Sequence, residues 1–194
     1  MTTFGSYTDE VAGGLRNVIA TDRCGTVISN DEAILKWADT AEAHKKRNGT
    51  FFFCGNGASC TMAEHLSHDC FQNAGFMTYT VSETSHLTAI SNDISYEDVF
   101  AYRISKMCND SDMLITVSSS GNSPNIIKAI SMAREKEMYI VTLSGKGSDN
   151  DSRKLGDINF YVPLDTYGLV ESAHAVLLHC WLDIYLDNYM GGRH

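Results

Sequence analysis

The sequence has very little proline and no long apolar run. Only two of its 194 residues are proline, and no hydrophobic stretch approaches the length of a membrane span. The first ten residues lack the basic stretch and apolar core of a secretory signal, so we expect a cytoplasmic protein outside any membrane. With 43% hydrophobic residues, the composition excludes the disordered and fibrous classes. We expect one domain over residues 1–194, with a helical segment at about 1–48 and an α/β core at about 49–190.

Positive charge is also scarce. The chain has 15 Lys and Arg residues against 24 Asp and Glu residues, a net charge of -9. Because nucleic-acid backbones bind mainly to clustered Lys and Arg, this balance argues against a nucleic-acid partner. The basic residues at 44–47 follow a helix-like stretch at 31–43, where they complement the negative end of a helix dipole.

Cysteines with redox or zinc-binding spacing are missing as well. Six cysteines occur, at positions 24, 54, 60, 70, 108 and 180, and no two form a C-x-x-C pair. Four of them lie within apolar patterns that a small buried thiol fits. We therefore expect reduced, structural thiols.

Short apolar strands alternate with helical segments through most of the chain. Two helices are predicted first, at 7–20 and 31–46. The predicted strands are 50–54, 77–81, 113–117, 138–143 and 158–162. The helices predicted between and after them are 60–72, 96–108, 124–136 and 167–188. This alternation predicts an α/β fold, a doubly wound five-stranded parallel sheet flanked by helices.

A serine-rich loop follows the predicted strand 113–117. Ser118, Ser119, Ser120 and Ser123 surround Gly121, and Pro124 then begins a helix. Free N–H groups and the dipole at a helix start attract anions, and hydroxyl groups add further donors. The loop therefore indicates a phosphate site that needs no lysine or arginine. The alternative is a plain polar turn, because turns use the same residues.

A second loop of similar construction, 55–59, follows strand 50–54. In a parallel sheet both loops lie at the carboxyl edge of the strands, where ligands bind. Together they favour a phosphate-bearing substrate. Neither loop ends in the Gly-Lys-Ser/Thr of a nucleotide P-loop, and the dinucleotide fingerprint is absent.

Two helices carry residues suited to metal binding or proton transfer. His65 and Asp69 are four residues apart and share a helix face, while the last helix carries Glu171, His174 and His179. Histidine nitrogens and carboxylate oxygens are ligands that zinc accepts. Spacing alone does not distinguish a metal site from histidines that are simply packed in the core, so this alternative stays open.

The two loops, GNGAS at 55–59 and SSSGNSPNIIKAI at 118–130, resemble those of the sugar isomerase (SIS) fold, a flavodoxin-like arrangement. The segment 85–100 and the C-terminal helix narrow the resemblance to the phosphoheptose isomerase family, over about 31–187. The resemblance implies an aldose-ketose isomerase that converts sedoheptulose 7-phosphate to D-glycero-D-manno-heptose 7-phosphate. It implies use of this product in bacterial heptose biosynthesis, for lipopolysaccharide or capsule. It also implies a homotetramer, packed partly through the N-terminal helices, with active sites between subunits.

The resemblance also implies roles for individual residues. The phosphate contacts would come from Ser59 and the serines of the 118–123 loop, and the sugar contacts from Asn56, Asp93 and Glu171. One zinc ion per subunit would be bound by His65, Asp69, Glu171 and His179. Asp69 would be the catalytic base and His179 the catalytic acid. We interpret His68 as exposed or interfacial, and His174 as a support behind the ligands.

Four positions depart from the family pattern. Asp69 replaces a glutamate and Glu171 replaces a glutamine, whereas Gly168 and Asn73 stand where the family has an acidic residue and an arginine. The last two positions belong to the sugar end of the family's site. Two alternatives therefore remain, an isomerase of a different sugar phosphate and a non-catalytic SIS-type binding or regulatory protein.

Overall fold

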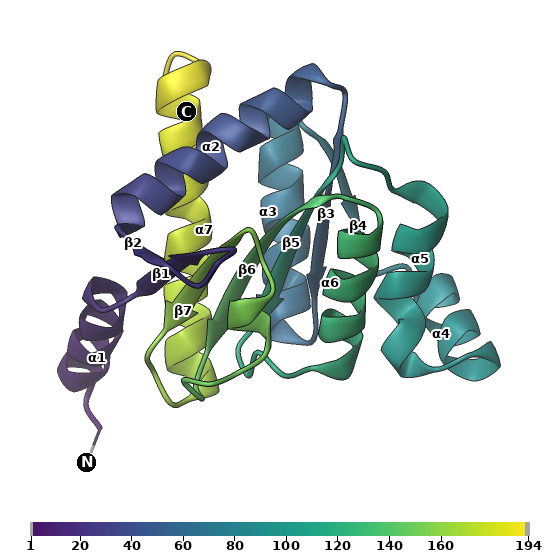
Figure 1. Cartoon of the computed structure of the whole chain (residues 1–194). Helices are drawn as coiled ribbons and strands as arrows, with labels where there is room; N and C mark the ends of the chain where they lie inside the picture. The colour runs from purple at the N-terminus through teal and green to yellow at the C-terminus, as the bar shows by residue number, and fades with distance from the viewer. Residues whose placement is uncertain (1, 193–194) are drawn as a thin grey trace.

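Seven strands form one sheet in the computed structural model, which describes residues 2–192 (Figure 1). The order across the sheet is β2-β1-β7-β6-β5-β3-β4. The five strands from β3 to β7 run parallel, and β1 pairs antiparallel with both β7 and β2. The strands are β1 Ile19–Asp22, β2 Val27–Ile28, β3 Thr50–Gly55, β4 Met77–Thr80, β5 Met113–Ser118, β6 Tyr139–Gly145 and β7 Ile158–Val162.

Seven α-helices and two short 3-10 helices connect these strands within the described residues. The α-helices are α1 Phe4–Arg16, α2 Asn30–Lys46, α3 Ala58–Ala74, α4 Thr84–Asp93, α5 Val99–Met107, α6 Pro124–Glu135 and α7 Tyr167–Tyr189. The 3-10 helices are η1 Tyr96–Asp98 and η2 Ser152–Lys154. The predicted α/β class and its five parallel strands are confirmed, but the predicted five-stranded sheet is wrong in number, because β1 and β2 extend it to seven strands.

The predicted helix 7–20 is wrong at its end, and the segment before residue 49 is not purely helical. α1 stops at Arg16, and Ile19–Asp22 adds a strand to the edge of the sheet beside β7. The Asp22 side chain accepts hydrogen bonds from the backbone N–H groups of Cys24 and Thr26, which closes the tight turn to β2. Pairing with the open edge of β7 outweighs the helical spacing here, because it satisfies backbone groups along both strands.

The segment between β4 and β5 also differs from the prediction. It contains α4, which was not predicted, and α5 begins at Val99 after η1, whereas the predicted helix began at 96. Lys128 of α6 forms ion pairs of 3.2 and 3.1 Å with Glu97 and Asp98, which holds η1 against α6.

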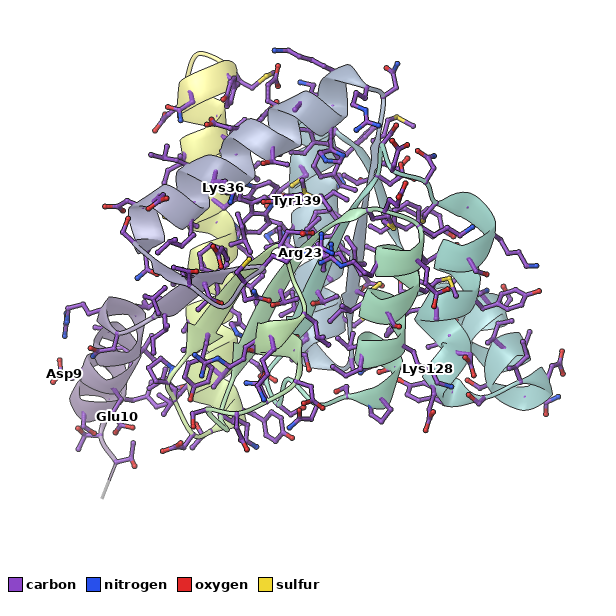
Figure 2. The ribbon with its side chains drawn as sticks, viewed as in Figure 1. Asp9, Glu10, Arg23, Lys36, Lys128 and Tyr139 are labelled. Carbon is purple, nitrogen blue, oxygen red and sulfur yellow. The ribbon has the colours of Figure 1, made fainter. Side chains whose placement is uncertain are left out.

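Alternate residues of the central strands build a separate core on each face of the sheet. Phe51 and Phe53 pack on the face covered by α2, α3 and α7, whereas Phe52 packs on the face covered by α5 and α6. On the first face Trp37 of α2 stacks on Trp181 of α7, with ring centroids 4.0 Å apart. The side chains in Figure 2 fill the space between the sheet and these helices.

The last helix, α7, is long and apolar enough to span a membrane by length and composition alone. In its most apolar window 56% of the residues are buried inside the protein, and a core helix meets the same test. The stacking of Trp181 on Trp37 shows that α7 packs as a core helix.

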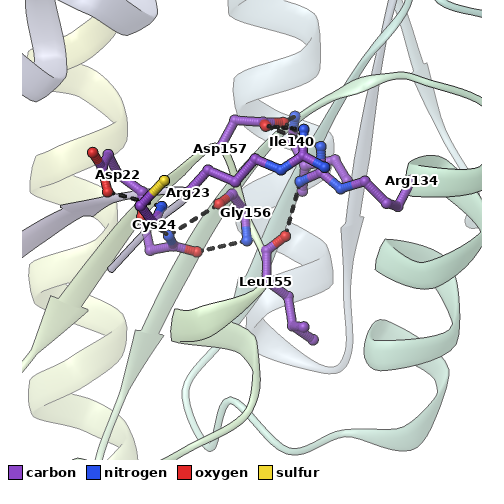
Figure 3. Close-up of polar contacts among 9 residues, drawn as sticks. Asp22, Arg23, Cys24, Arg134, Ile140, Leu155, Gly156 and Asp157 are labelled. Atoms are coloured by element: carbon purple, nitrogen blue, oxygen red, sulfur yellow. Dashed lines mark hydrogen bonds and ion pairs between the residues drawn. The ribbon is translucent and has the colours of Figure 1, made fainter. Parts of the chain in front are cut away.

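Asp157 organises the amino-terminal edge of β6 and β7 (Figure 3). Its carboxylate accepts two hydrogen bonds from Arg134 Nη1, at 2.9 and 3.0 Å, and one from the backbone N–H of Ile140 at 2.8 Å. The end of α6 is therefore joined to the start of two strands. The opposite, carboxyl edge of the sheet remains for ligand binding.

Strand order reverses between β3 and β5, which are neighbours in the sheet although β4 lies between them in the chain. After β3 the chain enters α3 on one face, and after β5 it enters α6 on the other. The two loops therefore diverge and leave a crevice at the carboxyl edge, the usual position of a ligand in such sheets.

His174 lies in the buried contact between α7 and the sheet. Its Nε2–H donates to the Ser144 carbonyl at 3.1 Å, and Nδ1 has no partner within residues 2–192. Burial lowers the pKa of His174 to about 4, although the hydrogen bond to Ser144 opposes the shift. The ring is therefore neutral in the folded protein at neutral pH.

Acid is expected to destabilise the protein partly through His174. Between pH 6.5 and about 4 the unfolded chain binds a proton at this ring and the folded chain does not, so stability falls by up to about 3 kcal/mol. His174→Gln removes this contribution. Urea unfolding at pH 7, 5.5 and 4.5 should show the wild type losing more stability than the variant as pH decreases. Parallel losses in both proteins would contradict the prediction.

Candidate functional site

A polar pocket of about 170 Å³ lies at the switch point between β3 and β5. A water molecule occupies roughly 30 Å³ in the liquid, so the pocket suits a small oxyanion and a few adjoining atoms. Among residues 2–192, no Lys or Arg lines it, and Glu171 is the one carboxylate in the lining. Its lining residues are Asn56, Ser59, Val117, Ser118, Ser119, Ser120, Ser123, Tyr167 and Glu171.

The serine loop is held in place from behind by the segment after β6. Gly121 has a φ of 66° and packs so closely on Asn150 that an added Cβ would lie 2.0 Å from Asn150 Oδ1. The backbone N–H of Ser152 donates to the Gly121 carbonyl at 2.9 Å. Ser119 is buried, and its Oγ has no hydrogen-bond partner among the residues that the structure describes. A fixed loop therefore presents a hydroxyl group to the pocket.

The start of α6 faces the same pocket. Ser123 occupies the N-cap position and Pro124 the first turn, as predicted, but the Ser123 side chain makes no capping hydrogen bond. Its hydroxyl group and the positive end of the helix dipole are therefore both available to an anion.

A reciprocal pair of amides joins the two loops. Asn56 Nδ2 donates to Asn125 Oδ1 at 2.9 Å, and Asn125 Nδ2 donates to Asn56 Oδ1 at 3.0 Å. Tyr96, in η1, donates a third hydrogen bond to Asn56 Oδ1 at 3.0 Å. Asn56 is thus held in one orientation at the pocket by residues 40 and 69 positions away.

A second cluster of polar side chains lies farther along α3 and α7. His65, Asp69 and His179 each direct a ligand atom to within 4.8 Å of the others. His65 Nε2 is 3.3 Å from Asp69 Oδ2, and the His65 and His179 rings are 5.5 Å apart. Both histidines are exposed, whereas Asp69 is half-buried. Two imidazoles and a carboxylate at this spacing fit a zinc ion, which prefers such ligands in tetrahedral arrangement.

The structure does not bring all of the predicted site residues together. Glu171 lines the serine pocket and does not belong to the cluster of His65, Asp69 and His179, so its place as a metal ligand stays a prediction. Asp93 ends α4, is exposed and lies outside the pocket lining. The prediction that His174 supports the ligands is wrong, because its ring faces Ser144. His68 is exposed, as expected.

Asn125 and Tyr167 are site residues that the sequence reasoning missed. Asn125 is buried in the first turn of α6, and Tyr167 begins α7. The sequence offered one signal for both residues, because each lies at the start of a predicted helix that follows a strand end on the ligand-binding edge. That signal does not show which of several polar residues there points into the pocket.

Three comparisons place the chain among known proteins. The sequence profile of the SIS domain matches residues 15–145. The phosphoheptose isomerase of Proteus mirabilis (strain HI4320) is 34% identical over 190 residues, covering 92% of this chain and 96% of that protein. The structure of a phosphoheptose isomerase from Francisella tularensis superposes with a TM-score of 0.82 at 24% identity, covering 96% of this chain and all of that one. The Neisseria gonorrhoeae phosphoheptose isomerase gives a TM-score of 0.79 at 24% identity, covering 94% of both chains.

Asn125→Leu is expected to destabilise the protein by about 1–3 kcal/mol, because it leaves Asn56 Nδ2 without an acceptor and Asn56 Oδ1 with Tyr96 as its remaining donor. The double variant Asn56→Leu/Asn125→Leu should regain part of this loss. Urea unfolding of both single variants and the double variant gives the coupling energy. Asn188→Leu, at an exposed position of α7, is the matched control. Strictly additive effects would show that the amide pair carries no mutual stabilisation.

Proposed function

The chain belongs to the phosphoheptose isomerase family of SIS-domain proteins, and from this we propose that it converts sedoheptulose 7-phosphate to D-glycero-D-manno-heptose 7-phosphate. The reaction supplies heptose for a bacterial glycan such as lipopolysaccharide or capsule. We place the enzyme in the cytoplasm.

The separation of the two polar clusters along α3 is the observation that best supports this substrate. Ser59 lines the serine pocket, and His65 and Asp69 follow six and ten residues later on the same helix. At 1.5 Å per residue these positions lie roughly 9 and 15 Å farther along the axis, and helical side chains tilt back toward the N-terminus. An extended chain of about seven bonds of roughly 1.5 Å spans roughly 9 Å. A seven-carbon sugar with its phosphate in the serine pocket therefore reaches the second cluster with its carbonyl end.

The reaction moves a proton between C1 and C2 of the sugar through an enediolate. Asp69 removes the proton from C1 and returns it to C2, and His179 transfers a proton between O2 and O1. Asp69 directs Oδ2 at His65, which leaves Oδ1 for the proton. The four hydroxyl groups of the serine loop hold the phosphate away from the chemistry, and this remote binding fixes the reacting carbons near Asp69.

His65, Asp69 and His179 are the residues that would hold one zinc ion per subunit. When bound, the ion supplies a Lewis acid that polarises the sugar carbonyl. His179 has two ring nitrogens, so one can bind the metal while the other carries the proton.

The exposed position of this cluster favours an oligomer. His179 borders an apolar groove along α7 that is lined in part by Ala175, Val176 and Ile184. Water has free access to an exposed histidine cluster, whereas an enediolate intermediate requires a shielded site. We propose a homotetramer in which a neighbouring subunit covers this face.

Incubation of the purified protein with sedoheptulose 7-phosphate and zinc should yield heptose 7-phosphate. Asp69→Asn should lower kcat on the order of a hundredfold to ten-thousandfold, because the amide cannot accept the proton. Asp69→Glu restores a carboxylate and should retain measurable turnover. Asp9→Asn, at an exposed position of α1, is the control. Absence of product from the wild type would overturn the proposed function.

Zinc content gives a test that does not depend on turnover. We expect about one zinc ion per chain in the wild type and substantially less in His65→Ala and His179→Ala, since each variant loses a ligand. His68→Ala, on the exposed face of the same helix, should retain the metal. Metal analysis after dialysis measures these ratios. Equal zinc in all four proteins would exclude this cluster as the site.

A different sugar phosphate is the second candidate, favoured by the contact at Gly168. A Cβ at this position would lie 3.0 Å from the Tyr7 hydroxyl group, so α1 occupies the space of a side chain there. A panel of five-, six- and seven-carbon sugar phosphates decides between the candidates. We expect the highest kcat/KM for the seven-carbon ketose. A higher value for a shorter sugar would assign the enzyme to that substrate, and inactivity on every sugar would favour a non-catalytic binding protein.

A further inference from the structure

The described lining of the serine pocket has no cationic side chain, although the proposed ligand is a phosphate dianion. In the part of the chain that the structure describes, the lining includes Glu171 but no Lys or Arg. Neutral hydroxyl donors bind a dianion less strongly than charge-assisted donors do. A cation close to the lining would therefore contribute strongly to binding.

Lys146 lies beside this pocket, directly after β6. Ser144 of β6 is the register partner of Ser118 of β5, so Lys146, two residues farther on, lies next to the serine loop. The neighbouring Gly145 packs against the same loop, since an added Cβ would lie 3.3 Å from the Ser119 carbonyl oxygen.

The Lys146 ammonium group is held on a residue of the pocket lining. Its Nζ lies 3.8 Å from the centroid of the Tyr167 ring, a close cation–π contact. It forms no salt bridge with a carboxylate of residues 2–192. By contrast, Lys128 near the other end of the loop is paired with Glu97 and Asp98. The charge on Lys146 is thus available to an anion that reaches Tyr167.

The backbone of Lys146 is fixed in an unfavourable conformation. Its φ is 56°, in the left-handed region that side chains with a Cβ rarely adopt. The backbone N–H donates to the Leu164 carbonyl at 3.0 Å, and the Tyr161 hydroxyl group donates to the Lys146 carbonyl at 2.7 Å. The surrounding contacts therefore hold a lysine in a backbone conformation that would be less strained for glycine. Backbone strain of this kind is typical of functional positions.

We propose that Lys146, held by Tyr167, supplies the positive charge that binds the phosphate group of the substrate. Its Nζ exchanges the aromatic ring for a phosphate oxygen when the pocket fills. Lys146 is therefore a specificity-determining residue for phosphorylated over unphosphorylated sugars. The inference rests on the proposed function only in taking a phosphate as the ligand.

Binding of inorganic phosphate tests this role without turnover. Titration calorimetry should give a Kd for Lys146→Met roughly tenfold higher than for the wild type, whereas Lys146→Arg should stay near the wild-type value. Lys36→Met, on the exposed face of α2 (Figure 2), removes an equal charge away from the pocket and should leave the Kd unchanged. Sodium chloride should weaken phosphate binding less in Lys146→Met than in the wild type. Ser119→Ala should also weaken binding, which locates the ligand in the serine pocket.

Kinetics on sedoheptulose 7-phosphate should show a KM increase of similar size in Lys146→Met with kcat little changed, because the charge binds the ground state and transition state alike. Unchanged phosphate affinity in Lys146→Met would overturn the inference, as would a wild type that binds no phosphate. A weakened phosphate Kd in a protein that turns over no sugar would support Lys146 and reject the proposed isomerase. Thermal unfolding of Lys146→Met confirms that the compared proteins are folded.

Discussion

The parallel pairing of β3 with β5 is the constraint on which the site depends. These strands are neighbours in the sheet, yet the helices that follow them pack on opposite faces. Their loops must diverge, and the crevice between them receives the serines of one loop and Asn56 of the other. The reciprocal hydrogen bonds between Asn56 and Asn125 then join the loops across the crevice. A one-residue shift in the register of β3 against β5 would separate this pair, because it would move every side chain of the shifted strand to the other face of the sheet.

In the proposed mechanism, the same arrangement separates substrate binding from chemistry. α3 and α7 both begin at the carboxyl edge of the sheet and run away from it, with pocket residues near their starts and His65, Asp69 and His179 farther along. Helical geometry makes this separation rigid, since each residue advances the axis by about 1.5 Å. A substrate anchored by its phosphate is therefore selected by length. The stacked Trp37 and Trp181 connect α7 to α2 and add to the rigid packing of that face.

The charges of the protein also bear on how the phosphate group is bound. The protein carries a net charge of -9, and its substrate is also anionic, so long-range electrostatics do not favour their encounter. In the proposed function, binding therefore comes from local donors, namely the serine hydroxyl groups, the start of α6 and the ammonium group of Lys146 on Tyr167. In the proposed function, a cation would neutralise the Asp69 carboxylate and sugar hydroxyl groups would donate hydrogen bonds to Glu171.

Local spacing in the sequence determined much of this protein. The alternation of strands and helices predicted the parallel sheet, the serines predicted the polar pocket, and the spacing of His65 and Asp69 predicted their contact, because each depends on neighbours within one element. The hairpin of β1 and β2 escaped prediction, since the edge of β7 stabilises it from more than 130 residues away, as the register of Thr21 with Asn159 shows. Only the tertiary structure decided that Glu171 faces the serines, that Asn125 pairs with Asn56 and that Lys146 lies on Tyr167. Each of these contacts depends on how a helix or a loop is oriented in the fold. Packing against distant elements sets that orientation, and the local sequence does not.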